Sequence, residues 1–134
     1  MMNDGFTFNT VGLLTRDNRA AVDFYTKTFG FTTDWDGVQP DVHLRLGDRS
    51  IDLFPRDAFE RLVSRKLDFP EGLNGAVMLG FEVPSFADVD KGYLQALESG
   101  EVSVLLPTTQ PWGQRTCYVA DPYGNLIEIG SFNK

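Results

Sequence analysis

A strand–turn–strand unit with one carboxylate in its second strand occurs twice in this chain and limits the folds open to it. Near the C-terminus, residues 116–132 (TCYVADPYGNLIEIGSF) read as strand, tight turn and strand, with Glu128 between Ile127 and Ile129. Because side chains alternate across a strand, the two isoleucines share one face and Glu128 lies on the other. A carboxylate is costly to bury, so the face of the strand that carries Glu128 either lines a water-filled or ligand-filled concavity or is open to solvent.

The first half of the chain carries the same pattern. Residues 47–54 (GDRSIDLF) make a turn and then a strand, with Asp52 between two apolar residues. In each half an apolar strand and a helical segment come first, within 11–31 and within 77–100. Matching positions lie 68 residues apart in the first strands and 76 apart in the last. A repeat of this length indicates a duplicated supersecondary unit.

Hydrophobic periodicity and turn residues predict the elements of both halves. Asp17 or Asn18 is expected to cap the first helix, and Gly30 fits its left-handed C-terminal position. Ser85 with Asp88 resembles a capping box with a shorter acid at the start of another helix. We expect strands at 6–15, 31–36, 41–46, 50–54, 75–83, 102–106, 115–119 and 126–132, and helices at 18–29, 57–67 and 85–99.

Three segments together resemble the glyoxalase / bleomycin-resistance / extradiol-dioxygenase superfamily, also called vicinal oxygen chelate, and are nearest to its bleomycin-resistance-like branch. These segments are VGLLTRDNRAAVDFYTKTFGF, IDLF and PWGQRTCYVADPYGNLIEIGSF, and the resemblance covers residues 7–132. It implies an α+β fold in which paired βαβββ modules form a cup-shaped mixed sheet around a small-molecule site. The expected organisation is a single domain (1–134) with a first module (6–54), a linker with a short helix (55–75) and a second module (76–132).

The resemblance also raises the question of a metal. Members that use a divalent ion present four ligands, one from the first and one from the last strand of each module. Carried across, these positions hold Thr10, Asp52, Met78 and Glu128. A neutral hydroxyl and a thioether do not suit the hard or borderline ions of this family, and two carboxylates are too few. We therefore expect no metal and no cofactor, and we assign no catalytic residue.

His43 is the only histidine. A two-residue turn at Gly47-Asp48 sets a hairpin register in which His43 faces Asp52 and Leu44 faces Ile51. Two interpretations follow. His43 is either a metal ligand or general base, or an imidazole hydrogen-bonded to Asp52 in the wall of a cleft.

The aromatic residues suggest what a cleft would bind. Trp35 lies between two aspartates and Trp112 lies in the loop before Arg115. In the bleomycin-resistance branch, the resemblance places an aromatic residue with nearby acids and the tryptophan of the PWG motif at the antibiotic crevice. Indole faces attract flat cations, and acids supply the counter-charge. The alternatives are that Trp35 covers a sheet edge, Trp112 packs a dimer interface and Arg115 pairs with a carboxylate.

Composition narrows the class of partner. The net charge of −7 and the pI near 4.5 argue against nucleic acid and anionic membranes. No apolar run reaches the roughly 18 residues needed to span a bilayer, and no signal peptide is visible. The single cysteine, Cys117, suits a cytoplasmic protein and is expected to be a buried, inert thiol rather than a nucleophile.

Two functions stay open at this point. One is a metal-independent protein that sequesters an aromatic or cationic small molecule. The other is an enzyme, either a metal-dependent lyase, isomerase or dioxygenase using His43, Asp52 and Glu128, or a metal-free acid–base catalyst. The predicted ligand-binding residues are Trp35, His43, Asp52, Met78, Trp112, Arg115 and Glu128. Similarity to the family further implies a homodimer, with Phe6, Phe8, Trp112 and Phe132 as candidate contacts.

Overall fold

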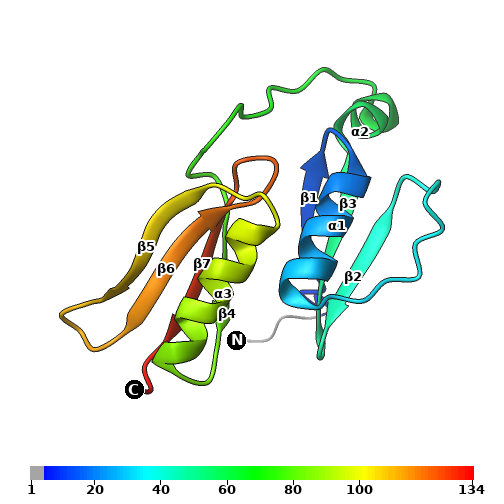
Figure 1. Ribbon diagram of the computed structural model, residues 1–134. Coiled ribbons are helices and arrows are strands. Elements are labelled where there is room, and N and C mark those ends of the chain that lie inside the picture. The colour runs from blue at the N-terminus through cyan, green and yellow to red at the C-terminus, as the bar shows by residue number, and fades with distance from the viewer. Residues whose placement is uncertain (1–4) are drawn as a thin grey trace. The chain divides into compact units, whose positions relative to one another are not determined.

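The computed structural model describes residues 5–134, and the chain divides into two compact units, Met1–Leu67 and Asp68–Lys134 (Figure 1). Each unit contains one mixed sheet and a helix that follows the first strand of that sheet. The α+β class and the two related modules predicted from the sequence are therefore confirmed. Within the described residues, no helix is both long and apolar enough to cross a membrane.

The first unit is built on a three-stranded sheet in the order β1-β3-β2. Strand β1 runs parallel to β3, and β2 runs antiparallel to it. Its elements are β1 (Val11–Thr15), α1 (Asn18–Phe29), β2 (Val42–Leu46), β3 (Arg49–Pro55) and α2 (Arg56–Val63).

Helix α1 begins and ends as the sequence predicts. The Asp17 carboxylate accepts a hydrogen bond from the Arg19 N–H, and Gly30 takes the left-handed conformation with φ of +79°. The helix lies along one face of the sheet (Figure 1). That face carries the buried core residues Leu13, Val42, Leu44, Ile51 and Leu53.

The β2–β3 hairpin has the predicted register. His43 pairs with Asp52 and Leu44 with Ile51, so the two polar side chains share the face away from α1. The N-terminal strand is shorter than predicted, because β1 begins at Val11 rather than at Phe6. Apolar and polar side chains alternate along residues 6–9, as they would in a strand. Periodicity alone therefore overestimates the length of this strand.

The strand predicted at 31–36 is wrong. Only one bridge forms there, between Thr32 and Arg45, through two backbone hydrogen bonds of 2.9 Å. Beyond it, side chains satisfy the backbone: the Thr33 hydroxyl accepts the Trp35 N–H, and the Asp36 carboxylate accepts two N–H groups of the following turn. Such local bonds compete with a ladder and turn the chain away from the sheet.

The second unit is built on a four-stranded sheet in the order β4-β7-β6-β5. Strand β4 is parallel to β7, and the remaining neighbours are antiparallel. Its elements are β4 (Met78–Glu82), α3 (Phe86–Glu98), β5 (Ser103–Thr109), β6 (Arg115–Ala120) and β7 (Leu126–Ser131). The Ser85 hydroxyl accepts the Asp88 N–H and donates to its carboxylate at 2.8 Å, which confirms the predicted cap.

Helix α3 covers one face of this sheet (Figure 1). Cys117, Val119, Ile127 and Ile129 are fully buried, and the tight fit of Gly92 against the Ile129 side chain shows that this set faces α3. Residues one position away along each strand, including Glu128, therefore lie on the opposite face. We call this the open face of the sheet, and we use the same name for the face of the first sheet away from α1.

The turn between β6 and β7 follows the predicted chemistry. The buried Asp121 carboxylate accepts hydrogen bonds from the Tyr123 N–H at 2.8 Å, the Asn125 N–H at 3.0 Å and the Asn125 amide at 2.9 Å. Gly124 has a φ of +82°, as this position of the turn requires. A Cβ there would lie only 1.7 Å from the carbonyl oxygen of Gly72.

Candidate functional site

The two open faces carry the same arrangement of three residue types. In each sheet a carboxylate on the central strand is flanked by a glycine on the parallel neighbour and by an aromatic proton donor on the antiparallel neighbour. These sets are Gly12, Asp52 and His43 in the first unit and Gly80, Glu128 and Tyr118 in the second. The strand pairing of each unit thus places one carboxylate at the centre of its open face.

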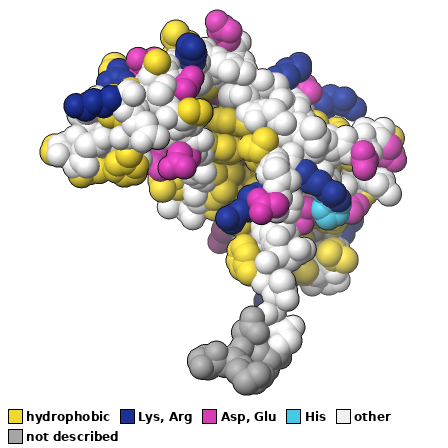
Figure 2. Space-filling view, turned by 90° about the horizontal axis from the view of Figure 1, so that it is seen from below, with side chains coloured by type: hydrophobic (Ala, Val, Ile, Leu, Met, Phe, Trp, Pro, Cys, Tyr) yellow, Lys and Arg dark blue, Asp and Glu magenta, His cyan; other side chains and the backbone are white. Residues whose placement is uncertain are grey.

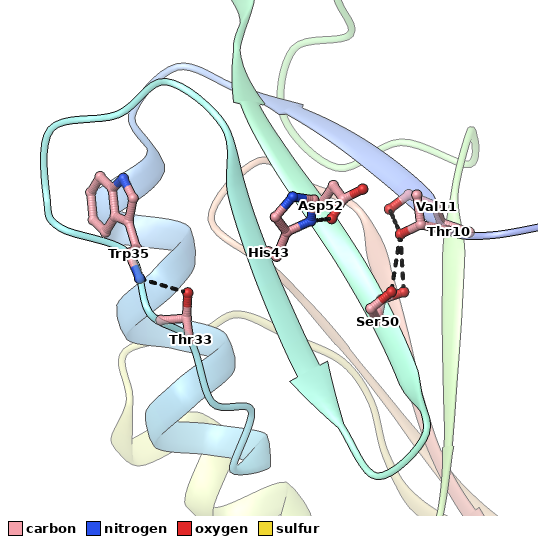
Figure 3. Close-up of polar contacts among 7 residues, drawn as sticks. All are labelled: Thr10, Val11, Thr33, Trp35, His43, Ser50 and Asp52. Atoms are coloured by element: carbon pink, nitrogen blue, oxygen red, sulfur yellow. Dashed lines mark hydrogen bonds and ion pairs between the residues drawn. The ribbon is translucent and has the colours of Figure 1, made fainter.

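In the first unit, His43 and Asp52 point toward each other from β2 and β3 (Figure 3). The Nδ1 atom of His43 is hydrogen-bonded to Oδ1 of Asp52. The imidazole remains 63% exposed, and in the space-filling view it lies at the surface beside acidic and basic side chains (Figure 2). Because Nδ1 is engaged and no described residue bonds Nε2, the second ring nitrogen is available to a ligand or to solvent.

A polar cleft of about 310 Å³ adjoins this pair and brings Trp35 and His43 into one lining. Its walls are formed by Thr32, Thr33, Asp34, Trp35, Gln39, Asp41, Val42, His43 and Arg45. The Arg19 guanidinium lies 5.2 Å from the centroid of the Trp35 ring, and Nε1 of the indole donates to the Gln39 carbonyl at 2.8 Å. Arg19 does not line this cleft, so the cation that lies over the Trp35 ring belongs to a neighbouring surface.

The loop that carries Trp35 is held by its neighbour. The Asp36 carboxylate accepts hydrogen bonds from the Gln39 and Val38 N–H groups at 2.8 Å each. These bonds hold the pKa of Asp36 below its usual range, because they stabilise the charged carboxylate. Trp35 thus lies beside a hydrogen-bonded turn rather than in a strand.

In the second unit, Glu128 is held by two hydroxyl groups on the open face. The Tyr118 phenol donates to Oε2 of Glu128 at 2.7 Å, and the Thr116 hydroxyl lies 3.3 Å from the same oxygen and 3.2 Å from the Ile129 carbonyl oxygen, which share its one proton. The hydrogen bond to Glu128 raises the pKa of Tyr118, with smaller contributions from burial and from the carboxylate charge. Oε1 of Glu128 accepts no hydrogen bond from a described residue.

A second cleft, of about 170 Å³, lies around Glu128. Its lining consists of Gly80, Phe81, Glu82, Gln114, Glu128, Gly130 and Phe132. The Gln114 amide lies so close to Gly130 that a Cβ there would be 2.7 Å from its Nε2 atom. Oε1 of Gln114 accepts a hydrogen bond of 3.0 Å from Nε1 of Trp112, which is itself 64% exposed. Trp112 is therefore linked to the rim of this cleft through Gln114.

The remaining predicted site residues lie elsewhere. Met78 is on the open face of the second sheet, two residues from Gly80 along β4, and is 54% exposed. Arg115 lies two residues before Cys117 on β6 and therefore shares the face toward α3, where its Nε atom forms an ion pair of 2.9 Å with Asp90 on that helix. The structure therefore places Arg115 on the opposite face of the sheet from Glu128. Its guanidinium charge is engaged by a carboxylate, one of the two alternatives that the sequence left open.

The four positions that hold a metal in related proteins do not form a suitable donor set here. The Thr10 hydroxyl donates to the Ser50 carbonyl at 3.2 Å (Figure 3), and Met78 offers a thioether. Asp52 and Glu128 are each hydrogen-bonded to a proton donor of their own sheet. Among residues 5–134, no cluster of three or more His, Cys, Asp or Glu side chains is arranged to hold an ion. A hard or borderline divalent ion does not fit these residues.

Sequence reasoning missed Tyr118 and the two glycines beside the carboxylates. Counting back from the turn at Asp121, as was possible for His43 and Asp52, would have placed Tyr118 opposite Glu128. Cys117 is buried as predicted, and burial raises the pKa of its thiol to about 11. The thiol is thus kept protonated and unreactive near neutral pH.

Comparison with known proteins gives a consistent result. A family model described as the Glyoxalase/Bleomycin resistance protein/Dioxygenase superfamily matches residues 7–129. The chain is 29% identical to the uncharacterized protein YraH of Bacillus subtilis over 89% of its own length and 93% of that protein. It is 30% identical to the uncharacterized protein Mb0911c of Mycobacterium bovis over 88% of its length and 78% of that protein.

Solved structures show the same fold. A glyoxalase/bleomycin resistance protein/dioxygenase family enzyme from Burkholderia phytofirmans aligns with a TM-score of 0.79 at 23% identity, over 92% of this chain and 97% of that one. A lactoylglutathione lyase from Agrobacterium tumefaciens aligns with a TM-score of 0.69 at 23% identity, over 93% of this chain and 92% of that one. At such identities the similarity establishes the fold, and the chemistry depends on the residues at the site.

Proposed function

Because the chain belongs to the glyoxalase/bleomycin resistance protein/dioxygenase superfamily, and its residues do not fit a divalent ion, we propose that it is a metal-independent small-molecule-binding protein. The ligand is an aromatic or cationic compound that the protein sequesters, as a bleomycin resistance protein does. The Glu128 carboxylate is its counter-charge. A cytoplasmic location is part of this proposal and is supported by the free, buried thiol of Cys117.

The observation that carries the proposal is the charge of the cleft around Glu128. Two carboxylates, Glu82 and Glu128, contribute to its lining, and none of the described lining residues is basic. Phe132 adds an exposed aromatic ring, and Gln114 adds an amide. An acidic hollow with an aromatic wall favours a cation that carries an apolar body.

The two tryptophans support the same ligand class. Trp112 is exposed and tied to the cleft by its hydrogen bond to Gln114, so its emission should report on occupancy. Trp35 lines a separate cleft that also contains His43. Replacing Trp112 by alanine should weaken binding of an aromatic cation by about 1–3 kcal/mol through lost stacking and apolar burial. The fold should survive, because Trp112 lies in a loop.

The proposal is tested by calorimetric titration with benzamidinium, a planar aromatic cation, and with benzyl alcohol as the neutral analogue. Each titration is run with and without EDTA. We expect the cation to bind more tightly than the alcohol. Glu128→Gln should weaken cation binding about 10-fold, equivalent to about 1.4 kcal/mol, and leave the alcohol unaffected. Glu98→Gln, which makes the same chemical change at an exposed site on α3, is the matched control.

Two results would contradict the proposal. If the wild-type protein and Glu128→Gln bind the cation with equal affinity, the Glu128 carboxylate is not part of the binding site. Loss of binding in EDTA would show that a metal ion is required and would favour a lyase, isomerase or dioxygenase using His43, Asp52 and Glu128.

A second candidate function is metal-free proton transfer at the first open face. The hydrogen bond between Asp52 and Nδ1 of His43 orients the imidazole and leaves Nε2 exposed, which is the arrangement of a general base. Such a base would take a proton from a substrate held in the cleft beside Trp35. The expected signature is a turnover rate that His43→Gln abolishes and Asp52→Asn lowers, since Asp52 no longer orients the imidazole.

We also propose that the protein is a homodimer. The support is the exposure of four aromatic side chains, Phe6, Phe8, Trp112 and Phe132, each of which would lose contact with water in an interface. Light scattering should give twice the 15.0 kDa mass of one chain. A constant monomer mass across micromolar concentrations would contradict this.

A further inference from the structure

Gly80 occupies the middle of β4, where glycine has no evident backbone role. Its φ is not among the positive values, which belong to other glycines in turns and helix ends. The pairing between β4 and β7 runs without a bulge from Met78 to Glu82, so no irregularity requires it either. Glycine within a strand is less favourable than alanine, because it loses more backbone freedom on folding and has no side chain to pack. Its presence at this position therefore needs another explanation.

Packing within the second unit does not supply that explanation. A Cβ at Gly80 would meet one atom, Oε1 of Glu128, at an ordinary contact distance of 3.6 Å. Gly130 is different, because a Cβ there would lie 2.7 Å from the Gln114 amide. Gly92 is also constrained, since a Cβ would lie 3.4 Å from two methyl groups of Ile129. Gly130 and Gly92 are accounted for by their neighbours, whereas Gly80 is not.

The space that Gly80 leaves open lies beside a carboxylate oxygen of Glu128 that accepts no hydrogen bond from a described residue. Oε2 of Glu128 is occupied by the hydroxyl groups of Tyr118 and Thr116, whereas Oε1 lies on the side of Gly80. The first unit repeats the pattern, because Gly12 pairs with Asp52 and a Cβ there would have no neighbour within 4 Å. A glycine at such a point marks a place where another group approaches the backbone closely.

We propose that Gly80 is a specificity-determining residue that admits a planar amidinium or guanidinium group, lying flat on β4 with one N–H donated to Oε1 of Glu128. This inference rests on the proposed function and adds the ligand class. A planar cation is thin enough to lie against the peptide while its in-plane N–H reaches the carboxylate. A methyl group at Gly80 would hold the cation away from the β4 backbone and lengthen its hydrogen bond to Oε1 of Glu128. The hollow of about 170 Å³ is large enough for one such group, with the rest of the ligand outside.

The test compares a planar cation, benzamidinium, with a tetrahedral one, benzyltrimethylammonium, against the wild-type protein, Gly80→Ala and Glu128→Gln. We expect the wild-type protein to prefer benzamidinium. Gly80→Ala should bind benzamidinium at least 10-fold more weakly and change benzyltrimethylammonium affinity less than 2-fold. Its Tm should stay the same or rise, because alanine is the better strand residue. Glu128→Gln should lose affinity for both cations.

The outcomes separate the two proposals. If Gly80→Ala binds benzamidinium as the wild-type protein does, or if its Tm falls, Gly80 is not a ligand contact, while the proposed function stands. If Glu128→Gln leaves both affinities unchanged, the proposed function fails as well. Absence of saturable binding of either cation by the wild-type protein at millimolar concentration would overturn both.

Discussion

Glu101 offers a test of how the second unit responds to pH. Its side chain is half-buried where the chain leaves α3 and enters β5, and its N–H donates to the Ala96 carbonyl at 3.3 Å. Burial, and then the negative charge of Asp121, raise the pKa of Glu101 from 4.5 to about 7. Glu101 in the folded protein therefore keeps its proton over a pH range in which the same residue of the unfolded chain releases it.

The sign of the effect on stability follows from linkage. Below pH 4.5 Glu101 is protonated in both states, and the stability that it contributes is fully present. As the pH rises from 4.5 to 7, the unfolded state binds fewer protons than the folded state, so the free energy of unfolding falls. The whole shift corresponds to about 3 kcal/mol. Because solvent reaches the half-buried carboxyl and screens it, we expect about 1 kcal/mol.

The perturbation is Glu101→Gln, which stays neutral at every pH. Relative to the wild-type protein it should have the same stability at pH 4 and be about 1 kcal/mol more stable at pH 8. Urea denaturation at both values gives the difference, followed by Trp112 emission in a Trp35→Phe background, so that only the second unit is observed. Glu98→Gln, at an exposed position, is the control and should show no such divergence. A constant difference between Glu101→Gln and wild type from pH 4 to pH 8 would refute the reasoning.

Two further predictions concern the second unit. Asp121→Ala should lower the free energy of unfolding by about 2–4 kcal/mol, because the hydrogen bonds to Tyr123 and Asn125 lose a buried acceptor; a loss below about 0.5 kcal/mol in urea denaturation would contradict this. The phenol absorbance of Tyr118 should titrate above the usual pKa of 10, and Glu128→Gln should bring it back toward that value; an unchanged titration in that variant would show that the hydrogen bond is not its cause.

The sequence predicted those parts of the structure that depend on local rules. The register that places His43 opposite Asp52 follows from a two-residue turn and the alternation of apolar residues, and both are properties of a short segment. The predicted strand at 31–36 failed because Asp36 and Thr33 satisfy the backbone with their side chains, an alternative that hydrophobic periodicity does not detect.

The candidate site was only partly predictable for a related reason. Glu128 and its face follow from alternation, but the ion pair between Arg115 and Asp90 joins residues 25 positions apart and depends on how α3 packs. The role of Gly80 is visible only once the space around a Cβ is known. Sequence patterns thus give the face on which a residue lies, whereas its partners across elements require coordinates.

The close approach of Gly124 to Gly72 has a practical consequence for dissecting the protein. Gly72 and Asn74 precede β4, yet the Asn74 N–H donates to the Gly124 carbonyl at 3.0 Å, and the Gly72 carbonyl fills the space beside Gly124. An expression fragment starting at residue 76 would contain every strand of the second sheet but leave this turn uncovered. A fragment starting at Asp68 would keep the covering segment. We therefore expect a fragment that begins at Asp68 to be more stable than one that begins at residue 76, because only the longer one keeps the contacts of Gly72 and Asn74 with the Gly124 turn.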